Sequence, residues 1–221
     1  MTALLAQVPL FRGLEADALA RIAQGTRELH VAKGQIIFHR GDFPSGFHLV
    51  EHGQVKLAIS SPQGGEKVVD VLEAGQVFGV AMMFLGKPYV TYAQTLKDSR
   101  LLHISKVVVA DEMERNPSLV RVIINALSMR LFTLITDVES YSLHSGCQRV
   151  IGYLLATVGE REQGALTVEL PTSKGVIASR LNLTQEHFSR ILRELLAAGL
   201  IVVDGRKVSI PSIARLRAYE I

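Results

Sequence analysis

Five polar side chains gather on one face of a predicted helix towards the C-terminal end of the chain: Gln185, Glu186, Ser189, Arg190 and Arg193. An arginine can donate two hydrogen bonds to guanine O6 and N7, and a glutamate can accept one from cytosine N4. Ser189 is small enough to let the helix backbone approach. Each such contact discriminates between bases by about 1–3 kcal/mol. The alternative is a solvated face on which Glu186 and Arg190, four residues apart, pair only with each other.

The opposite face of this helix is apolar, which predicts that it packs on a core. Its members follow the i, i+3, i+4, i+7, i+8 spacing: Phe188, Ile191, Leu192, Leu195 and Leu196. Thr184 is the expected N-cap, at the end of the turn Asn182-Leu183-Thr184, and Gly199 the expected C-cap. Two strands then flank a tight turn, which predicts a hairpin wing: Leu200–Val203, Asp204-Gly205-Arg206 and Lys207–Ile210.

A shorter helix should precede the helix that carries Glu186 and Arg190 (the reading helix) and run through Ile177 to Leu181. Thr172 or Ser173 can cap its first turn. Thr172 and Lys174, at its start, are further candidates for DNA contact. The two helices and the hairpin together predict a winged helix-turn-helix.

Upstream, a heptad series predicts a long helix that begins near Pro117 and pairs with a second copy of the chain. The alternating spacings of three and four continue over three heptads: Val120, Ile124, Leu127, Leu131, Leu134, Val138 and Tyr141. A second apolar face, which we expect to pack on the chain's own β-domain, comprises Leu119, Val122, Ile123 and Ala126. The alternative is a helix whose whole apolar stripe packs on that domain.

Short apolar runs separated by glycines indicate a β-barrel or sandwich before this helix. The strand candidates are Gln35–Phe38, Phe47–Val50, Gln54–Ile59, Lys67–Leu72 and Tyr89–Leu96. A short helix is expected over Leu14–Ala23, and a hairpin turn at Pro62-Gln63-Gly64-Gly65. Ser145-Gly146 breaks the heptad pattern and is the expected hinge, followed by an amphipathic helix from Val150 to Val158. The expectation is an α+β chain in three parts, residues 1–116, 117–144 and 145–221.

Composition limits the class of protein. The 221 residues are 48% hydrophobic and 20% charged, which is typical of a globular chain. The longest apolar stretch, read as Val77–Leu85, is too short to span a membrane, and the N-terminus lacks the pattern of a signal peptide, so we expect a cytoplasmic protein without a membrane partner. The positive excess lies in residues 145–221, with 10 basic and 7 acidic side chains, which favours a nucleic-acid-binding module there.

Catalytic chemistry is not expected. The chain has no Ser/His/Asp order, no metal-ligand spacing and no glycine-rich phosphate loop before a helix. The single cysteine, Cys147, excludes an internal disulfide and, alone, an iron–sulfur cluster. Beside Arg149, it is expected to be a hinge residue rather than a nucleophile.

Several motifs carry a resemblance that covers nearly the whole chain. They are Val8–Leu14, Gly41-Asp42, His52–Leu57 and the run from Phe188-Ser189-Arg190-Ile191-Leu192 through Gly205. In these the chain resembles the cyclic-AMP receptor protein / fumarate–nitrate reduction regulator (Crp/Fnr) superfamily. The resemblance implies a cyclic-nucleotide-binding-like β-roll, a dimerisation helix and a winged helix-turn-helix. It also implies a homodimeric transcription regulator that binds a DNA palindrome and works with RNA polymerase.

The reading residues resemble one branch of that family more than the other. Glu186-x-x-Ser189-Arg190 is similar to the pattern of the fumarate–nitrate reduction branch, which implies palindromes of the TTGAT/ATCAA kind. The cyclic-AMP branch carries an arginine where this chain has Gln185. Two reading helices must lie about 34 Å apart to meet successive major grooves, so an effector that shifts the long helix and the hinge could switch affinity.

The sensor motifs depart from the nucleotide-binding branch, which places a glutamate after a glycine for the ribose and an Arg-Ser pair for the phosphate. This chain has Gly79-Val80 and Tyr89-Val90 instead, and no cation there to compensate a buried phosphate. Cyclic AMP is therefore not the expected effector. The oxygen-sensing branch needs several N-terminal cysteines, which are missing. A cyclic nucleotide remains the alternative effector, and a ligand-binding module with a vestigial DNA-binding domain the alternative protein.

An apolar effector pocket is expected instead, formed by Phe78, Val80, Ala81, Met82, Met83, Phe84, Tyr89, Val90 and Tyr92. The run Ala81-Met82-Met83-Phe84 and the later Tyr89-Val90 resemble the nitrate-respiration regulator subgroup, which implies nitric oxide sensing and haem as the candidate cofactor. Methionines and aromatic rings suit a flat apolar ligand. The alternative is packing that fills a redundant cavity. Seven histidines are available, but none is identified as an iron ligand, and His187 is expected near phosphate.

Overall fold

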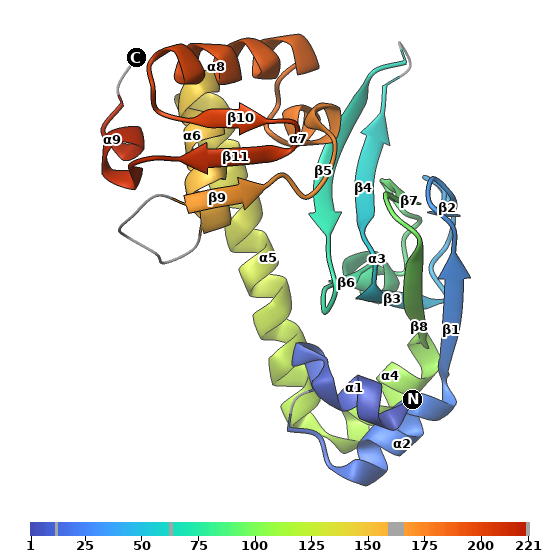
Figure 1. Cartoon of the computed structure of the whole chain (residues 1–221). Coiled ribbons are helices and arrows are strands. Elements are labelled where there is room, and N and C mark those ends of the chain that lie inside the picture. The colour runs from blue at the N-terminus through green and yellow to red at the C-terminus, as the bar shows by residue number, and fades with distance from the viewer. Residues whose placement is uncertain (12, 62–63, 159–165, 220–221) are drawn as a thin grey trace. The chain divides into compact units, whose positions relative to one another are not determined.

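The computed structural model describes every residue except 12, 62–63, 159–165 and 220–221. It contains two compact units, residues Met1–Thr133 and Leu134–Ile221 (Figure 1). Buried apolar clusters lie within each of them. The long helix α5, Pro117–Leu143, contributes its first part to one unit and its second part to the other. The predicted boundaries at 116/117 and 144/145 remain predictions.

The first unit is built around two four-stranded antiparallel sheets, with strand orders β1-β8-β3-β6 and β2-β7-β4-β5. Its strands are β1 Thr26–Val31, β2 Ile36–Phe38, β3 Gly46–His52, β4 Val55–Ser60, β5 Glu66–Leu72, β6 Val77–Phe78, β7 Tyr92–Thr95 and β8 Ser99–Ser105. Its helices are α1 Thr2–Gln7, the 3-10 turn η1 Pro9–Phe11, α2 Ala16–Gln24, α3 Val80–Leu85 and α4 Lys106–Arg115, followed by the start of α5. This is the expected β-roll.

Strands β1 and β8 were not predicted, although they pair over six residues from Thr26↔Ile104 to Val31↔Ser99. Strand β1 lies at a sheet edge, where charged residues are tolerated and obscure the alternation of a half-buried strand. The predicted strand Tyr89–Leu96 is wrong at its start, since only Tyr92–Thr95 is a strand. Tyr89 exchanges backbone hydrogen bonds with Gly41 and Asp42, which takes it out of the ladder.

Helix α5 begins at Pro117, as predicted. Leu119 and Ile123 are buried in the core of the first unit, and Val122 packs beside them, which confirms the second apolar face in part. Ala126 is exposed and lies outside this cluster, so its assignment to that face was wrong.

Among the described residues α5 is the helix long and apolar enough to cross a membrane, judged by length and composition alone. The reading of Val77–Leu85 as the longest apolar stretch overlooked it. Isolated charges such as Arg130 and Asp137 interrupt the run without making the helix polar on average. Length and composition do not distinguish a membrane span from an interface helix.

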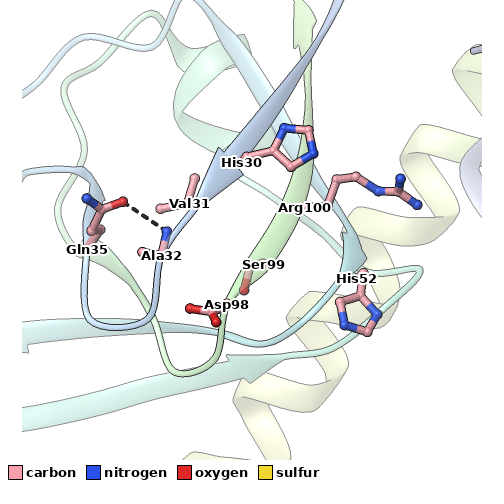
Figure 2. A pocket seen from close by; sticks show the side chains of 8 residues that line it. All are labelled: His30, Val31, Ala32, Gln35, His52, Asp98, Ser99 and Arg100. Carbon is pink, nitrogen blue, oxygen red and sulfur yellow. Dashed lines mark hydrogen bonds between the residues drawn. The ribbon is translucent and has the colours of Figure 1, made fainter.

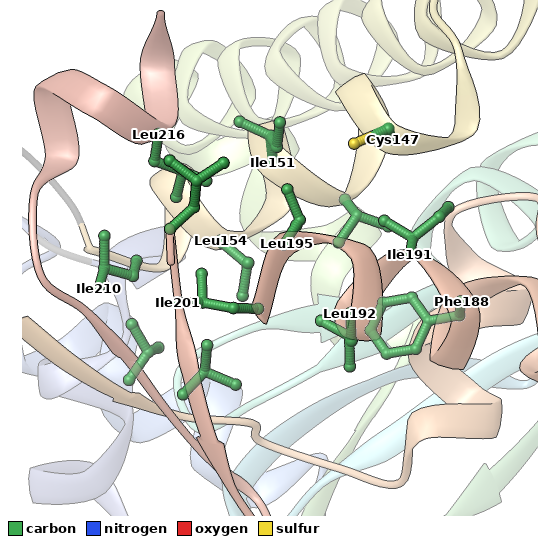
Figure 3. Close-up of a cluster of buried hydrophobic side chains, with 14 of the residues drawn as sticks. Cys147, Ile151, Leu154, Phe188, Ile191, Leu192, Leu195, Ile201, Ile210 and Leu216 are labelled. Carbon is green, nitrogen blue, oxygen red and sulfur yellow. The ribbon is translucent and has the colours of Figure 1, made fainter. Parts of the chain in front are cut away.

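The second unit holds the end of α5, then α6 Gly146–Val158, β9 Leu166–Glu169, α7 Lys174–Arg180, α8 Gln185–Ala197, β10 Val202–Asp204, β11 Lys207–Ile210 and α9 Ile213–Arg217. Its sheet has the order β10-β11-β9, and β9 was not predicted. Figure 3 shows apolar side chains from α6, α8 and the strands meeting in one core. The break between α5 and α6 is at the predicted place, and Ser145 and Gln148 exchange hydrogen bonds there, as in a capping box. Its role as a hinge remains a prediction.

Candidate nucleic-acid interface and sensor residues

Helix α8 has the two faces that its sequence predicts. Phe188, Ile191, Leu192 and Leu195 are buried in the core of the second unit. Leu196 is 44% exposed, so its assignment to the core was wrong. Eight residues after Phe188 the side chain has moved about 80° round the helix, to the edge of the apolar stripe. The Thr184 hydroxyl accepts a hydrogen bond from the His187 amide at 3.2 Å, which confirms the predicted N-cap.

The outward face of α8 carries the predicted base-reading side chains. Glu186 and Arg190 are exposed, and Ser189 is half-buried. Arg190 makes an ion pair with Glu194, four residues on, at 3.8 Å, beyond hydrogen-bond length. The anticipated pairing with Glu186 is therefore not the one observed. A loose, exposed pair of this kind contributes little and leaves the guanidinium available.

Two of the predicted DNA-contacting residues, Gln185 and Thr172, pack against other parts of the helix-turn-helix. Gln185 is exposed, but a Cβ added to Gly175 would lie 2.7 Å from its side-chain oxygen, so its amide lies against the first turn of α7. Thr172 is buried with 8% exposure, which leaves little of its side chain for a phosphate. Ser173 makes the cap of α7. Lys174 is half-buried and Arg193 exposed, and all these DNA contacts remain predictions.

The turn between α7 and α8 depends on Asn182, which has a φ of +57°, the one positive φ of a non-glycine residue in the described chain. Asparagine tolerates this left-handed backbone better than most residues. The C-cap of α8 is Ala198, one position before the predicted cap Gly199, and Gly199 takes the left-handed φ of +64° directly after it. Both conformations set where the reading helix begins and ends.

The wing is a two-residue hairpin between β10 and β11, closed by the pair Asp204↔Lys207. Arg206 at its tip donates two hydrogen bonds to the Leu170 carbonyl, at 3.0 and 2.7 Å. In return the Leu170 amide donates to the Arg206 carbonyl at 2.8 Å. The wing is thus held to the end of β9, a contact that joins residues 36 apart and has no local sequence signal.

His187 does not point away from its unit. A Cβ added to Gly146 would lie 3.1 Å from the His187 ring, so the ring packs on the first turn of α6. The expected position near phosphate remains untested.

Several apolar side chains of the predicted dimer seam on α5 are exposed in the single chain, as expected of side chains that a second copy would cover. Ile124, Leu131 and Val138 are 58, 60 and 63% exposed, and Leu134 is 38% exposed. Val120, Leu127 and Tyr141 are half-buried. Leu127 packs against the core of the first unit, whereas the exposed apolar seam positions on either side of it are typical of an interface.

Two family models match the chain: the cyclic nucleotide-binding domain over residues 28–116 and the Crp-like helix-turn-helix domain over residues 148–219. The solved structure of DNR from Pseudomonas aeruginosa is 32% identical, and the alignment covers 99% of this chain and 96% of that one with a TM-score of 0.52. The chain belongs to the Crp/Fnr family of transcription regulators. The resemblance is thereby confirmed at the level of the family, while the nitrate-respiration subgroup remains a prediction.

Other Crp/Fnr relatives agree in length and fold. The CRP-like cAMP-activated global transcriptional regulator of Mycobacterium tuberculosis is 23% identical over 220 residues, 98% of each chain. FixK2 from Bradyrhizobium japonicum is 20% identical, with 89% of this chain and 98% of that one covered and a TM-score of 0.78, and supports the fold alone. Crp/Fnr regulators bind DNA and act as dimers, and the curated relatives are named as regulators.

The predicted effector residues of this Crp/Fnr chain do not lie together. Met83 and Val80 belong to the cluster that contains Phe47, whereas Phe78, Met82 and Tyr89 belong to a second cluster around Phe38. Phe84 and Val90 are 40 and 55% exposed, and Ala81 is exposed. The Tyr92 hydroxyl instead donates to Glu66, and the Lys56 ammonium, 5.6 Å from the ring centroid, lies over the ring.

In the family resemblance, Tyr89 stands where the nucleotide-binding branch has its Arg-Ser pair. Its ring stacks on Phe38, with centroids 3.6 Å apart, and a Cβ added to Gly79 would lie 3.1 Å from its hydroxyl. Burial, with a further contribution from Asp42, raises the pKa of Tyr89 to about 12. The phenol therefore stays neutral and offers no positive charge to a phosphate.

A cavity of about 720 Å³ lies elsewhere in the first unit, and Figure 2 shows its lining. His30, Arg100 and His52 are neighbours in register across β1, β8 and β3. Arg100 is held by Glu51, with Glu28 at 3.7 Å. None of the nine predicted pocket residues lines this cavity or the second one described, of about 530 Å³.

Two further histidines are buried in the sheet of β3 and β8. His48 and His103 have ring centroids 4.9 Å apart, and the Nδ1 atom of each has no partner among the described residues. Burial first, and His103 second, lowers the pKa of His48 to about 3. No group of three or more metal-ligating side chains occurs in the part of the chain that the structure describes.

Proposed function

We propose that this Crp/Fnr regulator acts as a homodimer that binds a palindromic DNA site, with one α8 helix in the major groove of each half-site. The observation that carries the proposal is the outward face of α8, where Glu186 and Arg190 are exposed on a helix whose other face is anchored in a core. Glu186, Ser189 and Arg190 favour half-sites of the TTGAT/ATCAA kind. RNA polymerase is the partner of the bound dimer in this proposal.

The proposed dimer interface is the exposed stripe of α5. Two polar contacts support an interface helix over a membrane span. Arg130 makes a 2.6 Å ion pair with Asp70 of β5, and Asp137 makes one of 2.8 Å with Arg180 of α7. A helix fixed along its length by folded protein in this way is not free to cross a bilayer, and charged side chains in hydrocarbon are costly. Its remaining exposed apolar side chains need a cover, which a second copy supplies.

The proposed effector is a small apolar molecule rather than cyclic AMP. The stacking of Tyr89 on Phe38 supports this, because it puts a neutral ring where a phosphate would need a cation. The predicted residues give a haem no support, since those that are buried are divided between two packed clusters and none lines either of the two cavities described. A ligand of that size requires a cavity of several hundred Å³. Nitric oxide sensing through haem remains a hypothesis that spectroscopy can test.

The DNA proposal is tested with Arg190→Ala, measured on a TTGAT/ATCAA palindrome and on random DNA of equal length and at equal salt. Loss of about 1–3 kcal/mol on the palindrome corresponds to roughly 5- to 150-fold weaker binding. Random DNA should be affected little. Arg217→Ala is the matched control, because it removes one exposed positive charge from α9 and leaves α8 intact. An equal loss by Arg190→Ala on both DNAs would contradict the base-reading role.

The effector proposal is tested by calorimetric titration with cyclic AMP and by absorbance during haem titration, with and without nitric oxide. No heat of binding with cyclic AMP is expected. Binding of cyclic AMP at micromolar concentration would overturn the exclusion of the nucleotide. A stoichiometric Soret shift that responds to nitric oxide would restore the haem hypothesis and imply a conformation different from this one. Neither result alters the DNA proposal.

A further inference from the structure

One arginine joins the end of α5 to the first helix of the helix-turn-helix, within the second unit. Arg180, the last residue of α7, donates a 2.6 Å hydrogen bond to the Tyr141 hydroxyl and makes a 2.8 Å ion pair with Asp137. The side chains of Arg180 and Asp137 are only 18 and 22% exposed. A partly buried pair of this kind with a second hydrogen bond is stronger than a surface ion pair.

Tyr141 makes a second bond in the opposite direction. Its hydroxyl donates to the backbone carbonyl of Arg180 at 2.6 Å. The last carbonyls of a helix have no partner within the helix, so the phenol satisfies one of those of α7. Burial raises the pKa of Tyr141, so the proton needed for this bond is retained at neutral pH. The guanidinium and the backbone carbonyl of Arg180, the last residue of α7, are thus both bound to the Tyr141 hydroxyl of α5.

The end of α5 is braced from α6 as well. Arg149 donates to the carbonyls of Tyr141 and His144, at 3.3 Å each. Asp137 and Tyr141 are four residues apart and so lie on one side of α5. Tyr141 is also the last position of the heptad seam, so this side borders the surface that faces the second copy in the proposed dimer. The orientation of α7 is therefore set by residues next to the dimer seam.

Helix α7 in turn fixes the reading helix. The Leu183 amide donates to the Ala178 carbonyl at 2.8 Å across the turn, and Gly175 allows close contact with Gln185 of α8. A shift of α7 against α5 consequently moves α8 by a similar amount. Two such helices must be about 34 Å apart to enter successive major grooves.

We propose that Arg180, with Tyr141 and Asp137, is the positioning element that fixes α8 relative to the end of α5 and so sets the half-site spacing that the dimer accepts. This rests on the proposed function, since spacing has a meaning only for two reading helices. The element touches no base, and its role is to hold the angle at which the base-reading face is presented. Loss of this element leaves the base-reading face of α8 intact but permits a range of distances between the two α8 helices of the dimer.

The experiment uses the full-length protein with Tyr141→Phe, which removes both hydroxyl bonds and retains the ring. Affinity is measured on palindromes whose half-sites are separated by the natural spacing and by one or two base pairs more or fewer, and on random DNA. Wild type should prefer one spacing. The variant should lose about tenfold of that preference, the effect of a single charge-assisted hydrogen bond, with unchanged affinity for random DNA. Tyr219→Phe is the control, because the Tyr219 hydroxyl makes no hydrogen bond among the residues that the structure describes.

A second variant, Asp137→Asn, removes the ion pair with Arg180 with little change in side-chain size. It should likewise reduce the preference for one half-site spacing. It also provides the answer if Tyr141→Phe does not fold. Unchanged spacing preference in a folded variant, with wild-type preference clear, overturns the positioning role alone. Equal loss at every spacing and on random DNA also overturns it, since that is the effect of a general loss of stability. No preference of wild type for any palindrome overturns the proposed function itself.

Discussion

Substitution of Leu131 by alanine should weaken the dimer. The loss of dimerisation free energy can be calculated from the exposure of the Leu131 side chain. Full burial of a leucine side chain contributes about 1.5–3 kcal/mol. Leu131 is 60% exposed in the single chain, so about 1–2 kcal/mol remains to be gained on dimerisation. Alanine removes three of its four side-chain carbons, roughly 0.7–1.4 kcal/mol per copy, and a two-fold interface counts the change twice. The expected loss of about 1.5–3 kcal/mol is a 10- to 100-fold larger dissociation constant.

Sedimentation equilibrium over a range of protein concentrations measures this constant directly. Met129→Ala is the matched control, because Met129 is 58% exposed on the same helix but lies two residues from Leu131, away from the seam. The control should dissociate like wild type. A dissociation constant for Leu131→Ala within twofold of wild type, or an equal effect of Met129→Ala, would refute the assignment of the heptad stripe as the interface.

Two further predictions concern titratable groups. Because the pKa of His48 is lowered from 6.5 to about 3, the unfolded chain binds more protons than the folded one between these values. Stability should therefore fall as pH falls from about 6.5 towards 3, by at most about 1.4 kcal/mol per pH unit, and His48→Phe should lessen the slope in urea unfolding at several pH values. Equal slopes in both proteins would argue against a buried neutral imidazole. Burial raises the pKa of Cys147, so at pH 8 its thiol should react with a disulfide reagent far more slowly in native protein than in denaturant, and equal rates would place it at the surface.

The features that could be predicted from the sequence are those set by neighbours within one element. The apolar stripe of α8, its cap at Thr184, the start of α5 at Pro117 and the hairpin form of the wing all depend on contacts a few residues apart, although the turn of the wing has two residues and not the predicted three. Periodicity and capping chemistry report such contacts directly. Even there the edge of a stripe was uncertain, as the exposure of Leu196 and Ala126 demonstrates.

The sensor unit was predicted less well, because residue matches to a family do not fix packing. Nine residues that a pocket would require are divided between two clusters and the surface. The partners of Tyr89 and Tyr92 come from other strands and loops, namely Phe38 and Glu66. Local sequence contains no information on which of these contacts a ring will prefer.

By itself, the sequence determined the order of the parts and the chemistry of the reading face, since Glu186, Ser189 and Arg190 are brought to one side of a helix by its 3.6-residue period alone. Only the tertiary structure decided how that face is held. The bonds of Tyr141 to Arg180 join residues 39 apart, and those of Arg206 to Leu170 join residues 36 apart. Such pairs form because the packed core brings the chains of distant elements within hydrogen-bond distance, which no local pattern encodes.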